Sequence, residues 1–186
     1  MSIDNIIFLL IVGVLFLYII LALVRSLRLV PARMEFIVER FGRYNTTLGA
    51  GFHFLIPFVD RVAFTQDLKE HTMDVPPQTC FTKDEIQVEV DGVIYLQVVD
   101  SQKASYGITD FQYASIQLAQ TTTRAIIGTL DLDRTFEERE AISVKVVSVL
   151  DSAAAKWGVK ILRFEIKNLV PPESVRQSME KQVTAE

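Results

Sequence analysis

An uninterrupted apolar run near the amino terminus constrains this chain more than any other feature. Residues Ile6 to Val24 read IIFLLIVGVLFLYIILALV, nineteen residues with no charge, no proline and one glycine. As an α-helix rising about 1.5 Å per residue, the run would span roughly 28 Å, close to the roughly 30 Å hydrocarbon thickness of a bilayer. An α-helix forms all its backbone hydrogen bonds within itself, as the hydrocarbon of a bilayer requires. The run therefore predicts one transmembrane helix over residues 6–24, within a membrane anchor of residues 1–27.

A cleaved signal peptide and a buried core helix are the two alternative interpretations of this run. A signal peptide begins with basic residues, has a shorter apolar stretch and ends in small residues before its cleavage site. This chain begins MSIDN, which is acidic, and no A-x-A-like site follows the run. A core helix would carry a polar stripe, and the run has none. The pattern favours the anchor and leaves the two alternatives open.

The basic residues beside the run predict its orientation. Arg25, Arg28 and Arg33 all follow it, and no basic residue precedes it. The positive-inside rule then places the amino terminus outside and the rest of the chain in the cytoplasm. These juxtamembrane arginines are also expected to lie against anionic lipid headgroups. We expect a single-pass protein of the cell membrane, and the lone Cys80 agrees with a reducing compartment.

Size and charge exclude several classes of protein. At 186 residues the chain has room for about one domain beside the anchor. A net charge of -4, with no tract of lysine or arginine, argues against nucleic-acid binding, which needs a concentrated basic face. A single cysteine excludes a disulfide-stapled secreted module.

Alternation with period two predicts the strands of the body. The clearest strand runs over residues 86–98, where apolar side chains fall on even positions and Gly92 suggests a bulge or a bend. Further strands are expected over residues 34–39, 61–75, 78–82 and 159–170. The break at Pro76 and Pro77 separates the second from the third. In the last strand, Leu162, Phe164 and Ile166 are expected to point inward.

A period of 3.6 residues predicts the helices. One helix is expected over about residues 111–130. A second is expected to begin near Thr135 and Glu138, which have the spacing of a capping box, and to end at Gly158. A third helix begins after Pro171–Pro172 with an apolar stripe of Val175, Met179 and Val183. We expect an α+β domain over residues 28–170, with an antiparallel sheet and packed helices, followed by the start of a C-terminal helix over residues 171–186.

A second, shorter apolar run follows the Gly49–Gly51 turn and reads FHFLIPFV. It is too short to cross a bilayer. It is consistent with an ordinary buried strand, and equally with a segment that dips into the leaflet beside the anchor. On the second interpretation the residues in contact with the membrane are Phe52, Phe54, Leu55, Ile56 and Phe58.

No constellation of residues predicts catalysis, a cofactor or a metal. His53 and His71 have no ligand spacing, and nothing in sequence marks Cys80 as a thiolate nucleophile. The carboxylates around residues 131–140 are typical of a helix start. There is no nucleophile elbow, phosphate-binding loop or dinucleotide fingerprint. We therefore expect no enzyme and no cofactor. A membrane-tethered hydrolase is the alternative from another class.

Several motifs occur in the order typical of one family. They are ERFGRY, GFHFLIPFVDR, VPPQ, TKD, VEVDGVIY, TTTRAIIGTLDLD, EREAI, WGVK and EIKNLVPP. Over about residues 30–186 the chain resembles the stomatin branch of the stomatin, prohibitin and flotillin family, whose shared unit is the SPFH or band-7 domain. The short segment before the anchor is similar to the prokaryotic, single-anchor type.

The resemblance implies a non-enzymatic, membrane-anchored scaffold that forms homo-oligomers, organises membrane microdomains and modulates partner membrane proteins or proteases. It implies as partners the lipid bilayer, further copies of the chain and an NfeD-type membrane protein or a membrane protease, with no nucleic acid. A role as accessory subunit of a membrane protease complex is an alternative. The resemblance also implies a long coiled-coil helix after residues 182–186, a continuation that the printed sequence does not contain.

Overall fold

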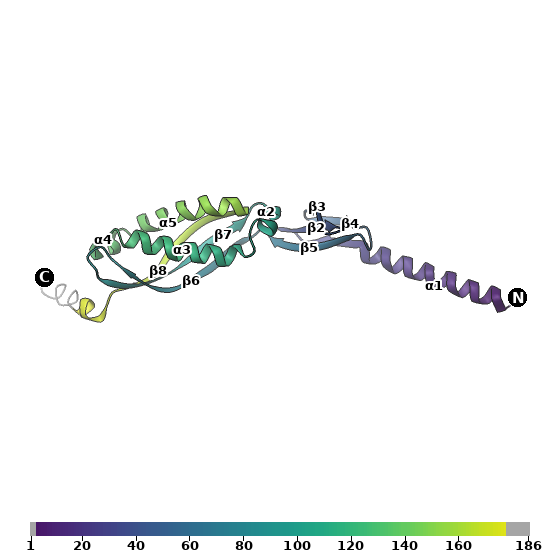
Figure 1. Cartoon of the computed structure of the whole chain (residues 1–186), viewed down its shortest axis with the longest axis horizontal. Coiled ribbons are helices and arrows are strands. Elements are labelled where there is room, and N and C mark those ends of the chain that lie inside the picture. Colours follow the sequence, from purple (N-terminus) through teal and green to yellow (C-terminus); the bar gives the residue numbers. More distant parts are fainter. Residues whose placement is uncertain (1–2, 178–186) are drawn as a thin grey trace. The chain divides into compact units, whose positions relative to one another are not determined.

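The chain divides into two compact units, residues 1–68 and residues 69–186. The structure, a computed structural model, describes the backbone of residues 3–177 and the side chains of residues 8–177. Figure 1 labels the elements of each unit. The sequence-based division into anchor, domain and C-terminal helix stays a prediction.

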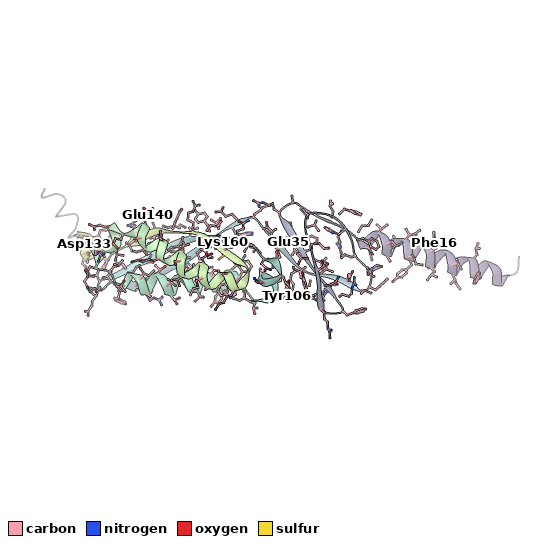
Figure 2. All side chains as sticks on the ribbon, turned by 90° about the horizontal axis from the view of Figure 1, so that it is seen from above. Phe16, Glu35, Tyr106, Asp133, Glu140 and Lys160 are labelled. Carbon is pink, nitrogen blue, oxygen red and sulfur yellow. The ribbon has the colours of Figure 1, made fainter. Side chains whose placement is uncertain are left out.

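The first unit begins with a long exposed helix, α1, over Ile3–Ser26. Its stretch Phe8–Ser26 is a candidate membrane span by length and composition, and none of that window is buried. Figure 2 shows the side chains of α1, with Phe16 labelled, projecting away from the helix without cover, and Phe16 is 64% exposed. A buried core helix would pack these side chains against other elements, so that interpretation does not fit the described residues.

Five short strands complete the first unit and form two antiparallel sheets. One is the two-stranded β1–β4 ribbon, and the other has the order β3-β2-β5. The strands are β1 (Leu27–Val30), β2 (Met34–Arg40), β3 (Arg43–Leu48), β4 (Gly51–Phe54) and β5 (Asp60–Asp67). Ile37 and Val38 of the central strand β2 are fully buried, so the core of this unit lies on both sides of β2.

The second unit is an antiparallel sheet of order β6-β7-β8 with helices packed on it. Figure 1 shows α3 and α5 running along the sheet, and α3 packs on β6 while α5 packs on β8. Its elements are β6 (Glu70–Phe81), β7 (Gln87–Val98), α2 (Ser101–Tyr106), α3 (Phe111–Ile127), α4 (Leu132–Glu137), α5 (Arg139–Ala154), η1 (Ala155–Trp157) and β8 (Val159–Val170). The predicted α+β class with antiparallel sheets is confirmed.

The long strand predicted over residues 86–98 is confirmed as β7. The residues at even positions from Val88 to Val98 are buried on one face of the sheet, and those at odd positions lie on the other face. The pairing of β7 with β8 shifts between Asp91 and Gly92, but the residue without a partner is Lys167, so the bulge lies in β8 opposite Gly92 and not in β7 as predicted. A side chain at Gly92 would place its Cβ 2.7 Å from the Glu165 carbonyl oxygen, so the close approach of β8 requires glycine there.

The break predicted at Pro76 and Pro77 is wrong. Strand β6 runs through both prolines, and its pairing with β7 shifts between Val75 and Gln78. Proline has no backbone N–H to donate to a neighbouring strand. Because β6 is an edge strand and both prolines lie in its bulge, no hydrogen bond of the sheet requires an N–H at these two positions. The chain instead leaves strand structure between β5 and β6, at Leu68 and Lys69.

The inward position predicted for Leu162 is also wrong. Tyr95 pairs with Arg163 and Leu96 pairs with Ile161, so Leu162 lies in a bulge without a partner across the pair. The extra residue reverses the alternation on its amino-terminal side. Ile161 is therefore buried, while Leu162 is 39% exposed.

The predicted capping box does not form. Thr135 lies inside the short helix α4, fully buried, and its Oγ1 donates to the Asp131 carbonyl oxygen over 2.9 Å. Glu138 binds Arg134 over 2.6 Å and precedes α5 without capping it through its side chain. Gly158 is confirmed as the helix stop, with a left-handed φ of 68°. Residues 173–177 are helical, as predicted, but Met179 and Val183 lie outside the described residues.

Candidate membrane-contact surface

The β1–β4 ribbon carries an exposed apolar face. Leu27 lies opposite Phe54, and Leu29 lies opposite Phe52. Directly opposed residues of an antiparallel pair project to the same side, and residues two apart along a strand share it. All four side chains therefore lie on one face, which we call the ribbon face, and they are exposed by 43%, 55%, 74% and 67%, in the order just given.

The opposite face of the ribbon is polar or buried. Arg28 lies across from His53, whose Nε2 is 2.8 Å from the Gly49 carbonyl oxygen, and Val30 is buried. The ribbon is thus amphipathic, with period-two alternation in both strands. A soluble protein rarely presents leucine and phenylalanine together on such a face, so an apolar phase or a partner is expected to cover it.

The loop after β4, residues 55–59, folds back beside the end of α1. The Leu55 amide donates to the carbonyl oxygen of Ser26, the last residue of α1, over 2.9 Å. The amides of Val59 and Asp60 both donate to the Ile56 carbonyl oxygen, over 3.3 and 3.0 Å, which closes the loop into a tight turn. The backbone hydrogen bonds tie this turn to the carboxyl end of the helix.

The side chains of this loop divide into exposed and buried sets. Ile56 and Phe58 are 43% and 78% exposed, which fits their predicted contact with the membrane. Leu55 is only 7% exposed, so its predicted place in the contact is corrected. Leu55 follows His53 by two residues, so alternation along the chain carries its side chain to the side opposite the ribbon face.

An ion pair holds the base of the loop. The Asp60 carboxylate accepts from Arg40 Nε over 2.8 Å and Arg40 Nη2 over 3.1 Å, and it also accepts from the Ile56 amide over 3.0 Å. These bonds, the Arg40 bond above all, hold the pKa of Asp60 below its ordinary value. The Asp60 side chain is only 4% exposed and stays ionised at neutral pH, so it fixes the turn against β2.

Phe58 lies against the helix in a strained conformation. Its φ is +67°, in the left-handed region that disfavours bulky side chains, and its ring stacks on Tyr18 of α1 with centroids 6.1 Å apart and planes at 27°. Tyr18 precedes the end of α1 at Ser26 by eight residues, about 12 Å along the helix. The loop therefore extends along the part of α1 that is a candidate membrane span.

The three juxtamembrane arginines lie in three different places. Arg25 is in the last turn of α1, Arg28 is in β1, and Arg33 is in the turn between β1 and β2 with a φ of +65°. All three are exposed. Sequence reasoning missed Leu27 and Leu29, although the alternation LRLV matches that of GFHF and was the available signal.

The residues weighed for chemistry are not brought together. Cys80 is fully buried in the core of the second unit, and burial raises the pKa of its thiol. Among the carboxylates near the start of α5, that of Glu138 acts structurally, since it pairs with Arg134. Across residues 8–177 no group of three histidine, cysteine or acidic side chains could hold a metal ion.

Comparison with known proteins shows to which family the chain belongs. Residues 28–186 match the model of the SPFH domain / Band 7 family, which is most of the chain. The chain belongs to this family. The resemblance to its stomatin branch is confirmed by relatives with stomatin-like names, and members of the family are membrane-associated and oligomerise.

Three relatives illustrate the match. The chain is 45% identical to human stomatin-like protein 2, mitochondrial, over 84% of this chain and 44% of that protein. It is 40% identical to stomatin-like protein stl-1 of Caenorhabditis elegans, over 84% of this chain and 48% of that one. An uncharacterized protein of Methanothermobacter thermautotrophicus is 41% identical over 87% of this chain and 51% of its own length. The chain spans about half the length of these relatives.

Proposed function

We propose that this SPFH protein is a non-enzymatic membrane scaffold that self-associates, organises a lipid and protein microdomain and modulates partner membrane proteins or proteases. The observation that carries the proposal is the exposed apolar surface of the first unit. There the ribbon face and the loop bearing Phe58 accompany a helix long enough to cross a bilayer. Family membership supports the same assignment.

The first step of the mechanism is attachment at two levels. Helix α1 crosses the bilayer, Phe52, Phe54 and Ile56 add a shallow contact with the leaflet nearest the carboxyl end of α1, and Phe58 reaches deeper beside Tyr18. In this proposal the ribbon face widens that contact through Leu27 and Leu29. Such a contact makes the protein sensitive to lipid packing, since it inserts apolar side chains beside the helix.

The second step is lateral association. Each copy has only a weak preference for a given lipid, but copies held together on a surface bind it jointly, so avidity multiplies the preference. Partners such as an NfeD-type membrane protein or a membrane protease would then be recruited to the patch. The proposed arrangement places the amino terminus outside and the chain after Arg25 in the cytoplasm, following the basic residues after the apolar run.

Cross-linking in intact membranes followed by mass measurement tests self-association and partners together. We expect ladders of homo-oligomers that persist when the protein is expressed at low level, and a matching large species when the detergent-solubilised protein is sized. A monomer in both measurements would contradict the scaffold. Digestion of both units by protease added outside sealed, right-side-out cells would overturn the cytoplasmic assignment.

The tethered hydrolase makes a different prediction. It requires an activated nucleophile, and the only thiol of the chain, Cys80, is buried with a raised pKa. Labelling of the purified full chain with a serine-reactive probe, lost on heat unfolding, would favour the hydrolase over the scaffold.

A further inference from the structure

A cavity of about 460 Å³ lies in the first unit between the last two turns of α1 and the loop after β4. Its walls come from α1, β1, the loop and the start of β5. Its lining includes the side chains of Tyr18, Leu21, Arg25, Arg28, Phe58 and Arg61. The cavity is a place on the first unit where basic and apolar side chains line one space.

The polar end of the cavity carries uncompensated positive charge. Arg25 and Arg28 form no ion pair with any residue the structure describes, whereas Arg61 binds Glu39 over 3.0 Å. The one acidic side chain in the lining, Asp60, is already engaged by Arg40. Two guanidinium groups are therefore available to an anion, and guanidinium groups bind phosphate through paired hydrogen bonds.

The other end of the cavity is apolar. Tyr18, Leu21 and Phe58 line it, and the stacked rings of Tyr18 and Phe58 form part of its wall. Tyr18 precedes Arg25 by seven residues, so the apolar and basic ends are about 10 Å apart along the helix axis. This order, with charge toward the membrane surface and apolar rings toward the bilayer, matches the order of headgroup and acyl chain in a phospholipid.

We propose that the cavity is a site for one anionic phospholipid. Its phosphate binds Arg25 and Arg28, and one acyl chain lies against the wall formed by Leu21 and by the stacked rings of Tyr18 and Phe58. The proposal rests on the proposed attachment to a bilayer, because only then does the cavity open to lipid. It differs from general attraction to an acidic surface in that it is saturable, with one lipid per chain, and depends on two particular arginines.

Native mass spectrometry of the full chain, released from phosphatidylcholine vesicles with and without phosphatidylglycerol, tests the site. We expect one phosphatidylglycerol to stay bound per chain. Because a hydrogen bond between charged groups contributes roughly a tenfold factor, the R25Q/R28Q variant should lose roughly a hundredfold in affinity. The matched control is R33Q/R43Q, which removes the same charge from exposed positions that do not line the cavity. Equal losses in both variants would overturn the proposal.

A second variant tests the site without a change of charge. Ala22 lines the cavity within α1, so A22L fills part of it while keeping an apolar helix. It should lower lipid retention and leave the yield of folded protein unchanged; full retention would count against the site. Displacement of the lipid by millimolar inorganic phosphate would identify a simple anion site instead. Cross-linking of the parent chain and of R25Q/R28Q in membranes separates the two proposals. Oligomers of both chains, with lipid lost only from the variant, support both proposals. A parent chain that binds the lipid but forms no oligomers contradicts only the scaffold.

Discussion

The position of Phe58 beside α1 predicts how deep the loop lies in the membrane. If residues 6–24 span the hydrocarbon, Tyr18 lies six residues inside its boundary, about 9 Å deep and roughly 6 Å from the bilayer centre. The Phe58 ring stacks on Tyr18 with centroids 6.1 Å apart, so it lies at a similar level. Loop insertion thus goes well beyond the headgroups.

The free energy gained when the Phe58 ring enters the bilayer can be worked out from the exposed fraction of its side chain. Phe58 is 78% exposed, and complete transfer of a phenylalanine side chain out of water contributes about 1.5–3 kcal/mol, so the ring gains about 1–2 kcal/mol. That free energy corresponds to a factor of about 5 to 30 in favour of the inserted loop. The loop is then inserted for most of the time even without help from its neighbours.

Tryptophan fluorescence measures the depth directly. Trp157 is the only tryptophan, so F58W in a W157F background carries a single reporter in the loop. We expect strong quenching by lipids brominated deep in the acyl chain and weak quenching by acrylamide. F81W in the same background is the control, because Phe81 is 59% exposed and belongs to the second unit, outside the predicted membrane contact. Quenching of F58W by acrylamide but by no brominated lipid would refute the reasoning.

Three further predictions concern the supports of this surface and of the fold. The Asp60 contribution is present above the ordinary carboxyl pKa of 3.8 and is lost as the pH falls through the lower folded value, so the loop should loosen only in that acidic range. The D60N variant should be loose at pH 7 already, with weaker deep quenching of the reporter at position 58. The G92A variant should lower the free energy of unfolding by about 1–3 kcal/mol in thermal denaturation, because its Cβ meets the Glu165 carbonyl oxygen, whereas G49A, with nothing within 4 Å, should change it little. The Cys80 thiol should react with a maleimide only after unfolding, since it is fully buried and its pKa is raised.

Each of these predictions has an outcome that contradicts it. A D60N loop as deeply quenched as the parent would mean that the ion pair does not hold the turn. Equal stability of G92A and G49A would mean that β8 does not approach β7 as closely as described. Rapid labelling of the native thiol would place Cys80 outside the core.

Local periodicity was enough to predict much of the architecture. The apolar run before Arg25 predicts α1, since a membrane-spanning helix is recognised from length and composition alone. The alternation over residues 86–98 predicts β7 and its buried face. These features depend on neighbours in the chain, so the sequence contains the information needed to predict them.

Pairing between distant segments decided the rest. The alternation of LRLV cannot say that Leu27 and Leu29 face Phe54 and Phe52, about 25 residues away, because any two alternating strands could pair. Leu55 is buried where its amide donates to Ser26, a contact across almost thirty residues that the local pattern does not contain. The bulge at Leu162 likewise depends on the register against β7. Tertiary structure therefore determined which apolar side chains remain exposed to form the membrane-contact surface.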